Sequence, residues 1–115
     1  MAAITIGPGR PYAHESIAVD ATAGGKALTA ATYNATLIAN GQVTNRRPVR
    51  ALITVEDQSL RWTVDGTTVS STVGHLAAAT SDPFMLEGYD AITQFRAIRA
   101  TGTSSNIRVT YFRND

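Results

Sequence analysis

Apolar and polar residues alternate in the middle of the chain. In residues 51–56, Ile53 and Val55 fall on one face of an extended segment, and residues 60–65 repeat the alternation after a short polar link. A period of two residues is typical of a strand with one buried face. The pattern therefore predicts a β-hairpin over residues 51–64, with Trp62 on the buried face of its second strand.

Other short segments have the same period or are bounded by turn residues. They predict strands at residues 15–20, 26–33, 84–87, 96–100 and 106–113. The pairs Asn40-Gly41 and Asp65-Gly66 indicate tight turns, and Asp90 can cap one helical turn. Residues 67–82 are rich in Ser, Thr and Gly and predict a long connection. About eight short strands without a long helix favour an all-β fold, an antiparallel β-sandwich or jelly roll.

The beginning of the chain has a different character. Residues 1–14 are punctuated by glycine and proline and predict an extended N-terminal arm. Residues 15–115 are expected to form a single β-sandwich domain, because a chain of this length can enclose one core. The arm carries the residues expected to contact a partner, which are Ile4, Ile6, Arg10 and Tyr12.

Composition narrows the possible classes of function. The chain contains no cysteine, which excludes disulfides, zinc fingers and thiol catalysis. A net charge of +1 argues against binding to nucleic acid or to a membrane surface. No apolar run reaches the roughly 20 residues of a membrane span. The first residues lack the basic start and the apolar stretch of a signal peptide, so we expect none. Charged residues make up 17% of the chain, which suits a surface covered by neighbouring proteins.

The sequence offers no motif for catalysis or for metal binding. The histidines are His14 and His75, and neither belongs to a metal-binding pattern such as HxH or HExxH. The chain also lacks a GxSxG nucleophile motif and the glycine-rich loops that bind phosphates. We therefore expect a protein that is not an enzyme and that has no cofactor and no metal site.

Two further features have a structural and a functional interpretation. Arg46, Arg47 and Arg50 form a basic cluster, which is either a solvated strand entrance or a site for salt bridges with a protein partner. A lone tryptophan can stack on a sugar or anchor an interface. Trp62 shares its face with Leu60 and Val64, so the pattern favours a core position.

Four segments of the second half share a pattern with a known group of proteins. They are RALITVEDQSLRWTVDGT, TVGH, LEGYDAITQFRAIRA and IRVTYFR. Together they resemble a family of small bacteriophage virion proteins, in which a strand runs into Asp-Gly-Thr and is followed by a glycine-containing loop, a short helical turn and two strands. Family members often have Pro-Thr or Pro-Ser after the Asp-Gly-Thr, whereas this chain has residues 68–70, Thr-Val-Ser.

The resemblance implies a structural role. Such proteins resemble capsid decoration (cement) proteins, which are usually β-sandwiches that bind as symmetric oligomers. It implies a virion protein, made in the host cytoplasm, that bridges neighbouring capsid subunits. Its expected partners are the major capsid protein and copies of itself, as a trimer or dimer, without nucleic acid or membrane. The alternatives are a small head–tail or tail component and a carbohydrate-binding β-sandwich, which would need exposed rings among Tyr33, Trp62, Tyr89 and Tyr111.

Overall fold

The computed structural model describes residues 10–34, 36–39, 42–45, 47–79 and 82–113, with side chains described outside residues 35–46. Most of the predicted arm, with Ile4 and Ile6, and also Arg46 of the basic cluster, lies outside the described residues. The strands are β1 (Arg10–Val19), β2 (Lys26–Ala27), β3 (Thr36–Ala39), β4 (Gln42–Asn45), β5 (Arg50–Val55), β6 (Leu60–Thr63), β7 (His75–Ala77), β8 (Phe84–Glu87), β9 (Arg96–Arg99) and β10 (Ser105–Arg113). The helices are α1 (Ala30–Tyr33) and α2 (Tyr89–Gln94).

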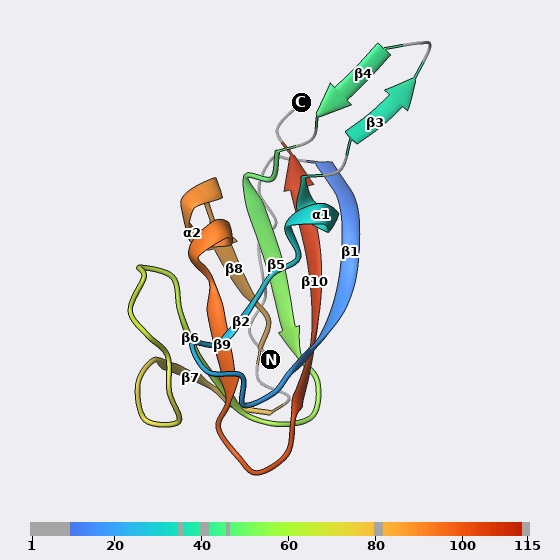
Figure 1. Cartoon of the computed structure of the whole chain (residues 1–115). Helices are drawn as coiled ribbons and strands as arrows, with labels where there is room; N and C mark the ends of the chain where they lie inside the picture. The colour runs from blue at the N-terminus through green and yellow to red at the C-terminus, as the bar shows by residue number, and fades with distance from the viewer. Residues whose placement is uncertain (1–9, 35, 40–41, 46, 80–81, 114–115) are drawn as a thin grey trace.

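Two antiparallel sheets of four strands make up the body of the molecule. One has the order β1-β10-β5-β8 and the other the order β2-β9-β6-β7 (Figure 1). β3 and β4 form a separate two-stranded hairpin, in which Ala39 pairs with Gln42 across the predicted turn. The turn residues 40–41 lie outside the described residues. The prediction of a mostly β, antiparallel protein is confirmed.

The two sheets share one apolar core. β10 contributes one face to this core, because the side chains at every second residue from Ser105 to Tyr111 are buried. The cluster is completed by residues of both sheets and both helices: Ile17, Val19, Leu28, Tyr33, Ala51, Ile53, Val55, Leu60, Ala77, Leu86, Ile92, Phe95, Ala97, Ile107, Val109 and Tyr111. Burial of these side chains is the main stabilising contribution, because each removes apolar surface from water.

The predicted hairpin over residues 51–64 is wrong. β5 pairs with β10 and β8, whereas β6 pairs with β7 and β9, so the link between them crosses from one sheet to the other. Asp57 fixes this crossing, since its carboxylate accepts hydrogen bonds from the backbone N and the side-chain amide of Asn106. A period of two residues reports one buried face, and that face exists whether the next strand lies in the same sheet or the opposite one.

Three boundaries also differ from prediction. Residues 26–33 form the short strand β2 and the helix α1 rather than one strand. The predicted connection 67–82 contains β7, which completes the second sheet beside β6. β1 begins at Arg10, so residues 10–14 of the predicted arm are strand and pair with β10.

The prediction of a helical turn capped by Asp90 is right about the helix and wrong about its cap. α2 covers the predicted helical turn, but its N-cap is Gly88, with a φ of 93°, and no side chain caps it. A positive φ is accessible to glycine without steric cost, so the backbone can change direction between β8 and the helix.

Candidate functional site

The sheet register gathers several predicted partner-binding residues at one end of the molecule. Arg10 at the start of β1 pairs with Arg113 at the end of β10, and the neighbouring Phe112 pairs with Arg50 at the start of β5. Figure 1 shows that the β3–β4 hairpin projects from this same end. We call it the hairpin end and define it as β3 and β4 with Arg10, Tyr12, Tyr33, Arg47, Arg50, Glu87, Tyr89 and Arg113.

All four tyrosines of the chain meet at or just below the hairpin end. The rings of Tyr33 and Tyr89 contact edge to face at 6.3 Å, and those of Tyr33 and Tyr111 lie 5.5 Å apart. The Tyr12 hydroxyl donates to the backbone O of Tyr33. Aromatic pairs in this geometry stabilise a fold beyond the area that they bury. The cluster therefore joins β1, α1, α2 and β10 through one set of contacts.

Tyr111 is the buried member of this cluster. Its side chain is fully buried and its hydroxyl donates to a carboxylate oxygen of Glu15 on β1. Burial raises the pKa of Tyr111 far above its usual value, and the neighbouring Glu15 carboxylate raises it further. Burial also raises the pKa of Tyr33. Both phenols are therefore neutral at physiological pH.

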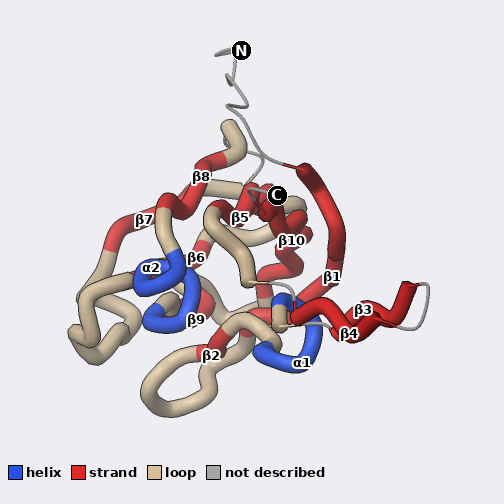
Figure 2. Tube along the Cα trace, turned by 90° about the horizontal axis from the view of Figure 1, so that it is seen from above, coloured by secondary structure: helices blue, strands red, loops and turns tan. Residues whose placement is uncertain are grey.

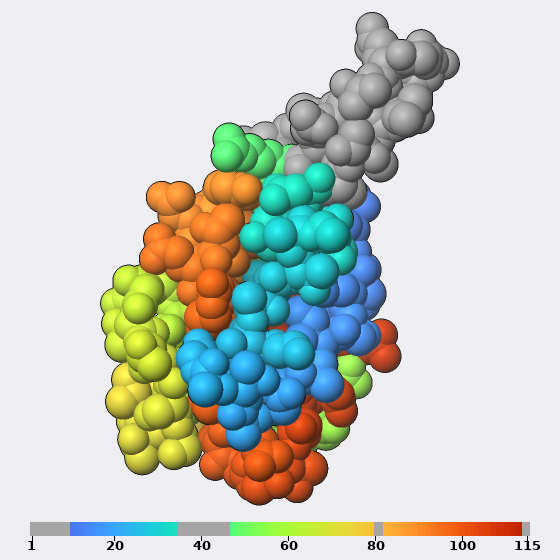
Figure 3. Space-filling model, viewed as in Figure 1, coloured from blue at the N-terminus to red at the C-terminus, as the bar shows by residue number. Residues whose placement is uncertain are grey.

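Tyr89 connects the two ends of the hairpin to the body. Tyr33 precedes β3 and packs on the Tyr89 ring, while Arg47 follows β4 and lies with its guanidinium 4.3 Å from the centre of the same ring. The Tyr89 hydroxyl donates to Oδ1 of Asn34 at 3.3 Å. Figure 3 shows the cyan atoms of α1 beside the orange atoms of α2. We call Tyr33, Asn34, Arg47 and Tyr89 the hairpin clamp.

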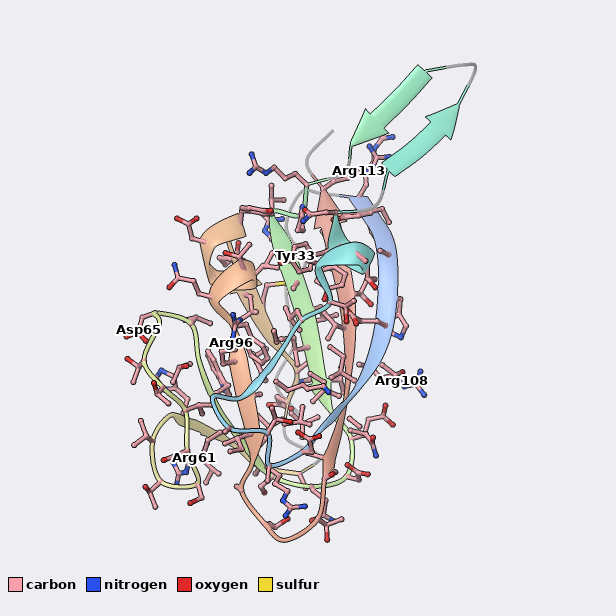
Figure 4. The ribbon with its side chains drawn as sticks, in the orientation of Figure 1. Tyr33, Arg61, Asp65, Arg96, Arg108 and Arg113 are labelled. Atoms are coloured by element: carbon pink, nitrogen blue, oxygen red, sulfur yellow. The ribbon has the colours of Figure 1, made fainter. Side chains whose placement is uncertain are left out.

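The charge of the hairpin end is mostly positive. Arg10 and Arg47 are exposed, and Arg113 lies close to the hairpin base (Figure 4). Nε of Arg50 donates to a carboxylate oxygen of Glu87 at 2.9 Å. An exposed pair of this kind contributes about 0–1 kcal/mol. The excess of arginine favours an acidic partner surface, because a guanidinium forms strong, directional bonds with carboxylates.

The structure brings together four predicted site residues, namely Arg10, Tyr12, Arg47 and Arg50. It also adds contacts that the sequence analysis missed, since Tyr33 and Tyr89 were considered only as sugar-stacking rings and residues 36–45 were not recognised as a hairpin. A signal for the hairpin was present, because Asn40-Gly41 lies between two short segments that contain Leu37, Ile38 and Val43.

Trp62 packs against the core but is only half-buried. Its ring stacks on Phe84 at 4.8 Å with nearly parallel planes, and His75 lies 4.8 Å away on β7. Among the described residues the large apolar side chains classed as exposed are Val73 and Leu76, and none is aromatic. Tyr33 and Tyr111 are buried, and Tyr89 is half-buried beneath Arg47. Trp62 and Tyr89 are therefore each partly covered, Trp62 by the rings of Phe84 and His75 and Tyr89 by the guanidinium of Arg47.

The hollows elsewhere on the surface are open. One of about 350 Å³ is lined by Thr63, Val64, Asp65, Thr67, Val73, Gly74 and His75. Hydrogen bonds from Thr67 lower the pKa of Asp65, so the Asp65 carboxylate already accepts hydrogen bonds within its own turn. Within the described ranges, no group of three or more acidic, histidine or cysteine side chains is placed to hold a metal ion. Neither described helix has the length and apolarity of a membrane span.

Comparison of the chain with protein-family models, with curated protein sequences and with solved structures gave no match.

Proposed function

We propose that this protein is a structural component of a bacteriophage particle, a decoration protein that bridges and stabilises neighbouring capsid subunits. Its partners are the major capsid protein and further copies of itself, and it acts without catalysis, cofactor, nucleic acid or membrane. The observation that carries the proposal is the β3–β4 hairpin, which extends from a clamped base at a basic end of the molecule.

The hairpin supports a role in assembly on physical grounds. Among the described strands, β3 and β4 pair only with each other. An isolated two-stranded hairpin is at best marginally stable in water. Its segments contain Leu37, Ile38 and Val43, and apolar residues on a projecting hairpin favour burial against another protein. The hairpin clamp holds the base in one orientation, which lowers the entropic cost of binding.

The strand order supports the finer fold class, the jelly roll. Apart from the hairpin, the described part of the chain forms eight strands. They pair as first with last and so on inward: β1 with β10, β2 with β9, β5 with β8 and β6 with β7. This is the order that results when a long antiparallel ribbon wraps into two sheets. Jelly rolls are common in viral capsid proteins and in lectins, so the class agrees with the proposal without deciding it.

The alternatives are less well supported. A carbohydrate-binding module needs an aromatic platform, and the rings considered for one are buried (Tyr33 and Tyr111) or partly covered (Trp62 and Tyr89). An enzyme needs a nucleophile with a base, or a metal, within reach of one cavity. In the hollow beside Asp65 and His75 the described residues form no metal-binding group, and the Thr63 hydroxyl donates to the backbone O of Thr67 rather than to a base. A head–tail or tail component would use the same kind of contacts and differs in copy number.

Copy number is therefore the direct test. Quantitative mass spectrometry of particles from the encoding phage should give hundreds of copies in simple ratio to the major capsid protein. A few dozen copies would indicate a neck or tail part, and their absence from particles would refute the proposal.

A shortened hairpin tests the element itself. Thr36 pairs with Asn45, so replacing residues 36–45 by Asn-Gly should close the chain without disturbing the sheets. We expect a folded protein by circular dichroism that no longer co-sediments with particles lacking it. A control with Thr36→Ser and Asn45→Ser keeps the length and should bind normally. Normal binding by the shortened protein would exclude the hairpin as the contact.

A further inference from the structure

Among the described residues, each four-stranded sheet ends in two terminal strands that have a sheet neighbour on one side only. These are β1 and β8 in one sheet and β2 and β7 in the other. A terminal strand presents backbone N–H and C=O groups that can pair with another chain. Proteins usually prevent such pairing with charged side chains, proline, bulges or very short strands at the edge.

Three of the four edges carry a charge, a proline or a bulge, whereas β7 has as its protection its short length of three residues. β1 contains Arg10, Pro11 and Glu15, and its register shifts between Pro11 and Ala13. β2 has two residues and begins with Lys26. β8 follows Pro83 and ends with Glu87, whose carboxylate binds Arg50. Each of these strands would bring a fixed charge, a proline or too few backbone groups to a new strand pair.

β7 has no charged side chain in the strand or in the segments that flank it. Residues 66–81 contain no Asp, Glu, Lys or Arg. Leu76, at the centre of β7, is 58% exposed and Val73, just before the strand, is 42% exposed. These are the exposed large apolar side chains of the described residues, and they lie within four positions of each other. Figure 2 shows β7 at the margin of the molecule, with no described strand beyond it.

We propose that β7 is a self-association edge, through which two copies of this chain pair antiparallel about a two-fold axis. Leu76 of one copy lies opposite Leu76 of the other, and His75 lies opposite Ala77. The second sheets of the two copies join into one continuous sheet. This deepens the proposed function, on which it rests, by naming the surface that joins copies of the protein.

The charge pattern argues for a second copy as the occupant. An uncharged edge is matched best by another uncharged edge, and β7 is the terminal strand of this chain that offers one. Arg61, the nearest cation, pairs with Leu76 on the neighbouring strand, and its guanidinium donates to the backbone O atoms of Ser71 and Gly74 (2.9 and 3.0 Å; Figure 4). Two such arginines would stand about three strand spacings, roughly 14 Å, apart. Salt screens charges at that separation.

Cysteine cross-linking tests the pairing directly, since the chain contains no native cysteine. Directly opposite residues in an antiparallel pair have Cα atoms about 4.5–5.5 Å apart, within the range that a disulfide spans. We expect Leu76→Cys to form a covalent dimer under mild oxidation at least about tenfold faster than Ala18→Cys, an exposed position on the protected strand β1. Equal rates, or faster cross-linking of Ala18→Cys, would overturn the proposal.

A charged substitution gives an independent readout. In sedimentation velocity, Leu76→Asp should move the monomer–dimer midpoint to at least about tenfold higher concentration, because two carboxylates would face each other. Leu76→Thr, which keeps an uncharged strand former, should move it less. An unchanged midpoint, or a chain that is monomeric at every concentration, would overturn the inference. Binding of Leu76→Asp to particles is measured separately, so loss of the dimer with normal particle binding leaves the proposed function intact.

Discussion

At the residue scale, one glycine explains how the loop before β7 reaches the sheet. Gly74 has a φ of 125°, and an added Cβ would lie 3.0 Å from the backbone O of Trp62 and 3.1 Å from Cγ2 of Val69. Val69 is buried, and Arg61 binds the backbone of the same loop. The loop therefore packs so closely on β6 that a side chain at position 74 would have to push a neighbouring atom aside.

This packing predicts a difference between two glycine substitutions. Gly24 also has a positive φ but has no atom within 4 Å of an added Cβ. Gly24→Ala should cost about 1–2 kcal/mol from backbone strain alone. Gly74→Ala should cost about 1–3 kcal/mol more, because the methyl group overlaps the backbone of Trp62. Urea unfolding of both variants measures the difference, and equal losses would contradict the close approach.

At the element scale, the hairpin clamp predicts that one ring controls the motion of the β3–β4 hairpin. Tyr89→Ala removes the surface on which Tyr33 and Arg47 lie, so the backbone amides of residues 36–39 and 42–45 should exchange faster. Tyr89→Phe keeps the ring and loses only the bond to Asn34, so it should exchange almost as slowly as the native chain. Hydrogen exchange measured by mass spectrometry distinguishes them.

The outcome for Tyr89→Ala must be compared with the body of the protein. Amides of β5 and β10, in the sheet centre, serve as the internal reference, because a general loss of stability would accelerate them as well. Equal acceleration in the hairpin and in β10 would mean that Tyr89 supports the whole fold rather than the hairpin. No change in either would show that the clamp does not restrain the hairpin.

The helices and strands also show which features of the fold a sequence pattern can predict. The alternation in β5, the spacing in α2 and the final strand were predictable, because one buried face leaves its period in the sequence. The partner of each strand was not, since β5 and β6 have the same period although they belong to different sheets. β7 was missed because a three-residue strand at an edge has no period to detect.

The candidate site was partly predictable for a related reason. Arg47 and Arg50 stand out as charges in a weakly charged chain. Tyr33 and Tyr89, by contrast, lie 56 positions apart, and only the pairing of distant strands brings them together. A single sequence contains no signal for such a contact.

At the scale of the whole molecule, the two proposed contacts lie on separate elements. The hairpin end is built by the start of β1, the end of β10 and the base of β3 and β4, whereas the self-association edge is β7 in the other sheet. In the proposed role, separate surfaces allow one copy to bind a capsid subunit and another copy at the same time. Repetition over a symmetric shell then multiplies weak individual contacts into a large combined stabilisation.

Two N-terminal truncations test where the body of this molecule begins. Deleting residues 1–12 removes Arg10 and Pro11 from their pairing with β10 and removes the Tyr12 hydroxyl that donates to Tyr33. Deleting residues 1–9 leaves all of these contacts in place. We expect the shorter deletion to keep the unfolding free energy within about 1 kcal/mol and to weaken particle binding, as the arm hypothesis requires. The longer deletion should cost about 1–3 kcal/mol more, from a lost hydrogen bond and lost ring packing.

Urea unfolding measures the effect on stability, and co-sedimentation measures the effect on particle binding. Equal stability of the truncated proteins would show that β1 gains nothing from its first residues, and normal particle binding after the shorter deletion would exclude residues 1–9 as a contact.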